Sequence, residues 1–152
     1  MHIVLVEPEI PANTGNIART CAATGTTLHL VRPLGFSTED KYLKRAGLDY
    51  WHLVEVLYHD SFEEFATRYQ GGRFYLATTK APRFHTEIVY EVDSFLIFGK
   101  ETKGLPPEIL SHYPDHQIRV PMINDARSLN LANSVAVVLY EALRQQGFSG
   151  LR

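Results

Sequence analysis

Three segments of the chain are richer in glycine, proline and small polar residues than packing alone requires. The first, residues 7–19, ends an apolar run with an acid and turns through two prolines into the start of a helix. Backbone N–H groups are free at such a start, and Gly15 would let another backbone or a phosphate come close. Arg19 follows Asn13 by about a turn and a half of helix, so both side chains could face one site. A capping Asn13 and a solvated Arg19 fit these residues equally well.

The second segment, residues 98–106, follows a buried apolar run and has glycines at both ends, Gly99 and Gly104. This pattern predicts a tight loop at the carboxyl end of a strand, where open α/β sheets bind ligands. The spacing matches neither a Walker loop nor a GxGxxG motif, so it gives little support to a nucleotide-phosphate site. On local physics alone, a structural turn fits as well.

The third segment joins residues 120–122 through a polar loop to residues 128–134, a helix start rich in serine and asparagine. Ser128 could have only a structural role, as an N-cap. Asn130 and Asn133 are poor residues for a helix interior, which favours a binding role for this turn.

The sequence gives less support to a metal site, a reactive cysteine or a hydrolase triad. His112 and His116 stand four apart, but Pro114 between them breaks any helix, so no metal site is expected. The single cysteine, Cys21, excludes an intramolecular disulfide and is expected to be a small buried side chain rather than a nucleophile. Ser128 lacks a GxSxG elbow, which makes a hydrolase triad improbable.

The elements that must position these segments follow from apolar runs and helix signals. Short, unalternating runs at residues 3–6, 28–31, 74–77, 95–98 and 118–120 predict strands buried on both faces. Helices are expected from Asn13 to about Ala23 with Gly25 beyond the end, from Ser37 with Asp40 near its third position, and at residues 61–69, 106–111 and 129–146. This alternation predicts an α/β fold with a mainly parallel sheet flanked by helices.

Length and composition fit one globular domain spanning residues 1–152. The chain is 45% hydrophobic and has a net charge of −2, so a polyanion must be held by a local cationic patch. No apolar stretch approaches the roughly 20 residues that span a bilayer, and no secretory leader is recognisable. A cytoplasmic protein with no membrane partner is therefore expected.

The last helix has an apolar stripe, and Val137, Val138 and Tyr140 extend it around the polar face. A helix that is apolar most of the way round is covered on more than one side, which suggests a homodimer. The alternative is that the core of a single chain covers both sides of this helix.

Taken together, the three segments resemble the three motifs of the SPOUT RNA methyltransferases. The matching residues are Asn13, Gly15 and Arg19, then Phe98, Gly99, Glu101, Gly104, Leu105 and Pro106, and finally Val120, Pro121, Met122, Ser128, Leu129, Asn130, Leu131 and Ala132. The opening residues 3–16, the stretch 44–50 and the overall length are similar to the TrmL (YibK-type) branch, over about residues 3–150.

The resemblance implies a doubly wound α/β fold with a C-terminal deep trefoil knot and a homodimer built partly on the first and last helices. It also implies 2′-O-methylation of the wobble nucleotide, a cytidine or modified uridine, in the anticodon stem-loop of leucine tRNAs. The methyl donor would be S-adenosyl-L-methionine, which leaves S-adenosyl-L-homocysteine, with no metal. Cofactor contacts carried over from the family fall on Ala77, Thr78, Gly99, Val120, Met122, Ser128 and Leu129; Ala77 is the chief departure from the branch pattern.

The resemblance also assigns roles to charged and polar residues. Arg19 would act on the ribose hydroxyl; because a guanidinium stays protonated, we expect it to bind the hydroxyl oxygen and the adjacent phosphate. Asn13 would orient Arg19 or the ribose, Glu101 and Asn130 would brace the loops, and Tyr140 would reach toward the partner's site. Cations expected to hold RNA are Arg19, Lys41, Lys44, Arg45, Lys103 and Arg127. Open alternatives are a related enzyme acting on another tRNA position or on rRNA, and a knotted RNA-binding protein without catalysis.

Overall fold

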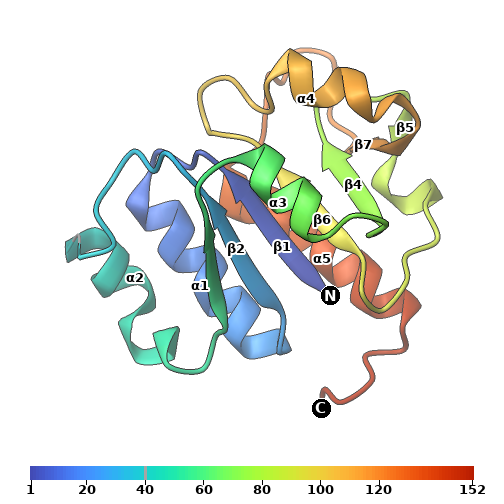
Figure 1. Ribbon diagram of the computed structural model, residues 1–152. Helices are drawn as coiled ribbons and strands as arrows, with labels where there is room; N and C mark the ends of the chain where they lie inside the picture. Colours follow the sequence, from blue (N-terminus) through green and yellow to red (C-terminus); the bar gives the residue numbers. More distant parts are fainter. Residues whose placement is uncertain (40) are drawn as a thin grey trace.

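The computed structural model describes residues 1–39 and 41–152, and the side chains of residues 44 and 46–49 fall outside that description. Within the described chain, seven strands form one sheet in the order β3-β2-β1-β6-β4-β7-β5, and every paired strand is parallel to its neighbour (Figure 1). The strands are β1 (His2–Val6), β2 (Thr27–Val31), β3 (Val56–His59), β4 (Phe74–Ala77), β5 (Arg83–Phe84), β6 (Phe95–Phe98) and β7 (Gln117–Arg119). Because all strands run the same way, their carboxyl ends share one edge of the sheet.

Helices cover both faces of this sheet. The α-helices are α1 (Pro11–Thr24), α2 (Lys41–Trp51), α3 (Phe62–Arg68), α4 (Pro107–His112) and α5 (Leu131–Gln145), with short 3-10 turns at His85–Glu87 and Pro114–His116. Helices α1 and α5 pack against one face, with α2 against α1, while α3 and α4 pack against the other (Figure 1). The predicted α/β class with a parallel sheet is confirmed.

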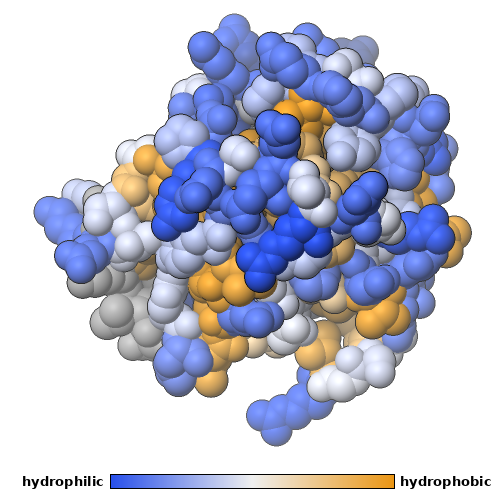
Figure 2. Space-filling view, in the orientation of Figure 1, coloured by the Kyte–Doolittle hydropathy of each residue, from blue (hydrophilic) through white to orange (hydrophobic). Residues whose placement is uncertain are grey.

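Two apolar cores separate along these faces. On the α1 and α5 side, Ile17, Leu28, Leu96 and Leu139 are fully buried. On the α3 and α4 side, Phe65 packs with Val4 and Ile97 of the central strands. Strands β1 and β6 are therefore apolar on both faces, which explains their unalternating sequences. On the face drawn in Figure 2, hydrophilic residues predominate and apolar residues form small separate patches.

The predicted strands β1, β2, β4, β6 and β7 are confirmed, with boundaries that differ by no more than one residue. Strands β3 and β5 had no clear signal. Three of the four β3 residues are only partly buried, and both β5 residues are exposed. Strand β5 is too short to show a pattern, and β3 has an apolar run of only three residues, 56–58.

Two predicted caps of the first helices are wrong. Helix α1 begins at Pro11, with Ile10 as its N-cap, so the predicted cap Asn13 lies inside the first turn; Gly25 closes the helix as expected, at a φ of 65°. Helix α2 begins at Lys41, four residues after the predicted cap Ser37, whose hydroxyl accepts a hydrogen bond from the Glu39 N–H. The prediction for Asp40 lies outside the described residues.

The helices at residues 61–69 and 106–111 are confirmed as α3 and α4. The hydroxyl of Ser61 caps α3 by accepting a hydrogen bond from the Glu64 N–H. Helix α4 has proline at its first position, where a missing N–H is tolerated. None of the helices in the described chain is long and apolar enough to cross a membrane.

Candidate functional site

A pocket of about 720 Å³ opens at the carboxyl edge of the sheet, where β4, β6 and β7 end and the loops after them meet. Each of the three chemistry-bearing segments contributes to its walls. The first supplies Ile10 and Asn13, the second supplies residues 98–105, and the third supplies residues from Val120 to Leu131. Segments that lie more than a hundred residues apart in the sequence thus surround one space.

Every residue assigned to cofactor binding lines this pocket: Ala77, Thr78, Gly99, Val120, Met122, Ser128 and Leu129. Ala77 is the last residue of β4, Gly99 follows β6 and Val120 follows β7. The three strands are neighbours in the sheet, so their ends are held side by side. The sheet order therefore explains why these loops converge.

The loop after β6 folds back on itself so tightly that residue 99 must be glycine. A Cβ at Gly99 would collide with the backbone of Gly104 and Leu105. Lys100 and Gly104 pair as an antiparallel bridge, with the Gly104 N–H donating to the Lys100 carbonyl over 2.8 Å. Gly104 has a φ of 67°, which favours glycine.

Glu101, at the tip of this loop, ties it to the start of α1. One carboxylate oxygen accepts a hydrogen bond from the Glu9 N–H at 2.8 Å. The other accepts from the Ile10 N–H at 3.0 Å and from the side-chain amide of Asn13 at 3.2 Å. The carboxylate thus satisfies free N–H groups at the helix start, which is where the sequence suggested a bound anion.

Asn13 also connects the start of α1 to the third segment. Its side-chain oxygen accepts a hydrogen bond from Nδ2 of Asn130 at 3.0 Å, and Oδ1 of Asn130 accepts from the Asn133 N–H at 3.2 Å. Asn130 is therefore the N-cap of α5, and the alternative that Ser128 is only a cap is excluded. Asparagine is a poor residue for a helix interior, but Asn130 lies at the cap, where asparagine is favoured. The expected bracing of the loops by Glu101 and Asn130 corresponds to hydrogen bonds in the structure.

Two further contacts fasten the loop after β6 to the loop after β1. The Thr102 hydroxyl and N–H both donate to the carboxylate of Glu9. Lys100 pairs with Glu7 at 2.7 Å, and this hydrogen bond raises the pKa of Lys100. The loop is thereby held to β1 by both ionic and neutral hydrogen bonds.

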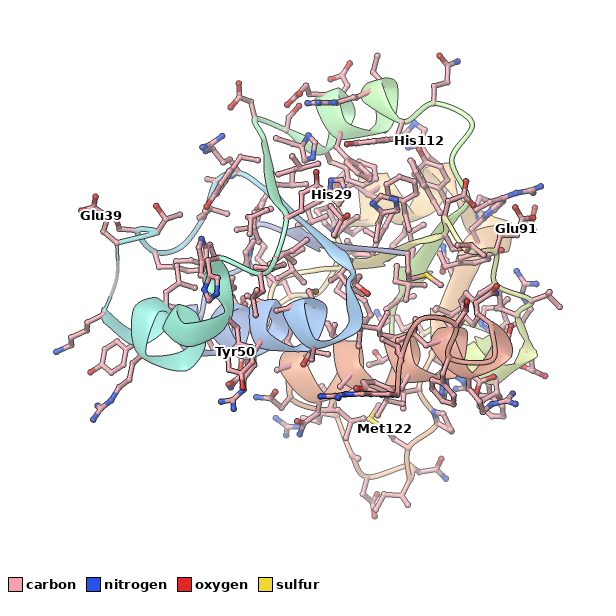
Figure 3. The ribbon with its side chains drawn as sticks, turned by 90° about the horizontal axis from the view of Figure 1, so that it is seen from below. His29, Glu39, Tyr50, Glu91, His112 and Met122 are labelled. Carbon is pink, nitrogen blue, oxygen red and sulfur yellow. The ribbon has the colours of Figure 1, made fainter. Side chains whose placement is uncertain are left out.

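Arg19 and Tyr140, which were assigned catalytic roles, do not line the pocket of their own chain. Arg19 is exposed on α1, its guanidinium carbon 4.5 Å from the ring centroid of Tyr50 and one nitrogen 3.4 Å from the Tyr50 hydroxyl. Tyr50 itself lies on α2 (Figure 3). Tyr140 is exposed on α5. Asn13, the third such residue, does line the pocket.

The cations assigned to RNA binding fall into two places. Lys103 and Arg127 are exposed at the pocket, whereas Lys41 and Arg45 are exposed on α2 and do not line it. The side chain of Lys44 lies outside the described residues. Three pocket cations were not predicted from the sequence: Lys80, Lys100 and Arg119. Arg119 directly precedes Val120, but one arginine at a strand end gives no signal that separates it from a solvated residue.

A row of histidines lies away from the pocket, on the sheet face that α3 covers. Nδ1 of His2 is 3.0 Å from Nε2 of His29, and Nδ1 of His29 is 2.9 Å from Nε2 of His59. Burial, with smaller contributions from His2, His59 and Arg68, lowers the pKa of His29 to about 3. The row is thus held neutral inside the aromatic core. No group of three or more potential metal ligands occurs among the residues that the structure covers.

The fold and the pocket define the class of protein. A doubly wound parallel sheet with a pocket formed by the loops after neighbouring strands is the arrangement of enzymes that bind a small cofactor. The family model described as "SpoU rRNA Methylase family" matches residues 1–140. The chain belongs to this SpoU methylase family, which confirms the resemblance found in the motifs.

Relatives with high identity cover the whole chain. The tRNA (cytidine(34)-2'-O)-methyltransferase of Methylovorus glucosotrophus is 52% identical over 149 residues, which are 97% of this chain and 97% of the relative. A solved structure concerned with "2-OH methylation of C/U34 on tRNA" has a TM-score of 0.92 at 46% identity, covering 96% of this chain and 95% of that one.

A more distant structure has a bound cofactor. The SpoU methyltransferase AviRb from Streptomyces viridochromogenes, in complex with AdoMet, has a TM-score of 0.83 at 25% identity. It covers 96% of this chain, and this chain covers 60% of it.

Proposed function

We propose that this protein is an S-adenosyl-L-methionine-dependent tRNA methyltransferase that methylates the ribose 2′-hydroxyl of nucleotide 34, in leucine tRNAs. The observation that carries the proposal is the chain of hydrogen bonds from Glu101 through Asn13 to Asn130, which joins all three motifs around one pocket. The activity of the relatives at position 34 supports the choice of nucleotide. Action on tRNA fits a cytoplasmic protein.

The described residues fit S-adenosyl-L-methionine. The pocket volume lies within the range of about 300–1,000 Å³ typical of small-molecule sites. Val120, Met122 and Leu129 offer apolar walls for adenosine, and backbone groups of the loops after β4 and β6 lie beside them. The bound cofactor would supply a methyl group on a sulfonium leaving group, which needs no metal. The protein's own task is then to desolvate and align the reactants.

Arg19 is the proposed catalytic residue for the ribose. Its guanidinium stays protonated, so it would bind the hydroxyl oxygen and the adjacent phosphate and leave the proton to another acceptor. Because Arg19 lies outside the pocket of its own chain, the proposal requires a second copy to complete the site. Its exposed position on α1 is compatible with this role.

A homodimer through the exposed faces of α1 and α5 would supply that second copy. Val137 and Tyr140 are large side chains that remain 42% and 46% exposed on α5, while Val138 belongs to the chain's own core. The homodimer would cover the two exposed residues and bring Tyr140 toward the partner's pocket. The C-terminal trefoil knot and the single domain over residues 1–152 remain predictions from the resemblance.

The test is to incubate the protein with labelled S-adenosyl-L-methionine and total tRNA from a strain that lacks it, and then to map the modified nucleotide by nuclease digestion and mass spectrometry. We expect one 2′-O-methyl group at nucleotide 34 of leucine tRNAs. Methylation at another tRNA position, or of rRNA only, would contradict the substrate. No methylation together with no cofactor binding would contradict the enzyme.

A further inference from the structure

Arg119 is a pocket residue to which neither the motifs nor the comparisons give a role. It is the last residue of β7 and directly precedes Val120 in the pocket wall. Its guanidinium carbon lies 4.8 Å from the ring centroid of Phe84 on the neighbouring strand β5. The aromatic ring supports one face of the guanidinium plane and leaves its edge free to donate hydrogen bonds.

The buried edge of this guanidinium lacks a partner. Nε of Arg119 is fully buried and has no hydrogen-bond acceptor in the described part of the chain. No carboxylate among the residues with described side chains forms an ion pair with it. A buried cationic donor without an acceptor is destabilising, so such a group indicates a missing anionic partner.

The protein's own carboxylate in the pocket is already engaged. Both oxygens of Glu101 accept hydrogen bonds from the start of α1. The other pocket cations differ from Arg119: Lys100 is paired with Glu7, and Lys80, Lys103 and Arg127 are exposed. Arg119 is thus a half-buried pocket cation for which the described residues supply no anion.

We infer that Arg119 binds the α-carboxylate of the amino-acid part of S-adenosyl-L-methionine, an inference that rests on the proposed function. This carboxylate is the one anionic group of that molecule, and a guanidinium fork matches a carboxylate in a bidentate way. Arg119 lies at the strand end beside the apolar residues proposed to hold the adenosine. The exposed Lys103 and Arg127 are better placed to contact phosphates of a large substrate.

The test compares two ligands that differ in the amino-acid part, which contains the proposed contact. S-adenosyl-L-homocysteine has the carboxylate, whereas 5′-methylthioadenosine has the same adenosine and sulfur with no amino-acid chain. Their dissociation constants are measured by calorimetry for the natural protein, for Arg119→Met and for Lys80→Met. The Lys80 variant also removes one positive charge from the pocket, so it controls for a general electrostatic effect.

We expect Arg119→Met to weaken S-adenosyl-L-homocysteine by about 10- to 100-fold, the range for a lost charge-assisted hydrogen bond, and to change 5′-methylthioadenosine less than about twofold. Lys80→Met should leave the ratio of the two constants unchanged. Arg119→Lys keeps the positive charge but not the planar guanidinium, so it should weaken the binding of S-adenosyl-L-homocysteine less than Arg119→Met does and leave that of 5′-methylthioadenosine unchanged. It replaces Arg119→Met in the test if the methionine variant does not fold.

Equal losses for both ligands would overturn the inference and show that Arg119 only supports the loop. Unchanged binding of both ligands with weaker tRNA binding would also overturn it, in favour of a phosphate contact. Failure of the natural protein to bind either ligand would instead overturn the proposed function, and the inference with it.

Discussion

Asn130 donates a 3.0 Å hydrogen bond to the side chain of Asn13, although 117 residues separate the two in the sequence. Asn130 also caps α5 by accepting from the Asn133 N–H. One amide therefore fixes the start of the last helix and joins it to the first. Residues 128 and 129, which line the pocket, directly precede this joint.

Replacing Asn130 by alanine should destabilise the fold by about 1–2 kcal/mol, because it removes both a helix cap and a hydrogen bond between helices. It should also weaken S-adenosyl-L-homocysteine binding, since the loop before α5 loses its anchor. Urea unfolding and calorimetry measure the two effects. Ser128→Ala is the matched control for stability, because Ser128 is not the cap. A larger stability loss in Ser128→Ala than in Asn130→Ala would contradict this account.

Gly99→Ala should disrupt the pocket, because the new methyl group would overlap the backbone of Gly104 and Leu105. The loop must move, and we expect a stability loss of about 1–3 kcal/mol with strongly reduced binding of S-adenosyl-L-homocysteine. Gly104→Ala is the comparison, since open space surrounds that position and only its φ of 67° opposes a side chain. That change should cost about 1 kcal/mol. A Gly99→Ala protein that binds the ligand normally would show that the tight loop is not required.

Arg19→Ala should abolish methylation while leaving S-adenosyl-L-homocysteine affinity unchanged, because Arg19 is proposed to bind the ribose hydroxyl and phosphate of the RNA and not the cofactor. Arg19→Lys should also be inactive if a bidentate contact with phosphate is needed. Tyr50→Leu should lower turnover partly, since the Tyr50 ring supports the guanidinium at 4.5 Å. Transfer of a labelled methyl group measures turnover, and calorimetry measures the affinity for S-adenosyl-L-homocysteine. Near-normal turnover in Arg19→Ala would remove Arg19 from the mechanism.

The positions of strands and the pocket walls were predictable for different reasons. Strand β6 could be located from four consecutive apolar residues, whereas β3 has a run of only three, residues 56–58, which are partly buried at the edge of the sheet. The pocket residues followed from matching motifs. Local composition could not show that Asn13 and Asn130 meet, because a contact over such a separation depends on strand order. Arg119 was not predicted as a binding residue, because the burial of its Nε atom depends on the packing of the folded chain.

The buried histidine row predicts a pH dependence of stability. The pKa of His29 falls from an ordinary value of 6.5 to about 3 in the fold, so the unfolded chain binds the extra proton between these values. Stability from this residue is therefore fully present above pH 6.5 and is lost as the pH falls toward 3. In His29→Leu the decrease in unfolding free energy across this range should be smaller. His112→Gln, at an exposed histidine outside the row, should keep the decrease of the natural protein.

The exposed pocket cations predict how tRNA binding depends on salt. Because the net charge is −2, attraction to RNA must come from local contacts such as Lys103 and Arg127 rather than from the whole molecule. Each phosphate contact that is lost should reduce the slope of log affinity against log salt by about 0.7–0.9. We therefore expect Lys103→Gln to lower both the affinity and this slope, measured by filter binding between low and physiological salt. Arg73→Gln is the control, because Arg73 precedes β4 at the opposite edge of the sheet and pairs with Glu91 at 3.2 Å. If both variants keep the slope of the natural protein, the phosphates are held elsewhere, and the exposed cations of α2 become the next residues to substitute.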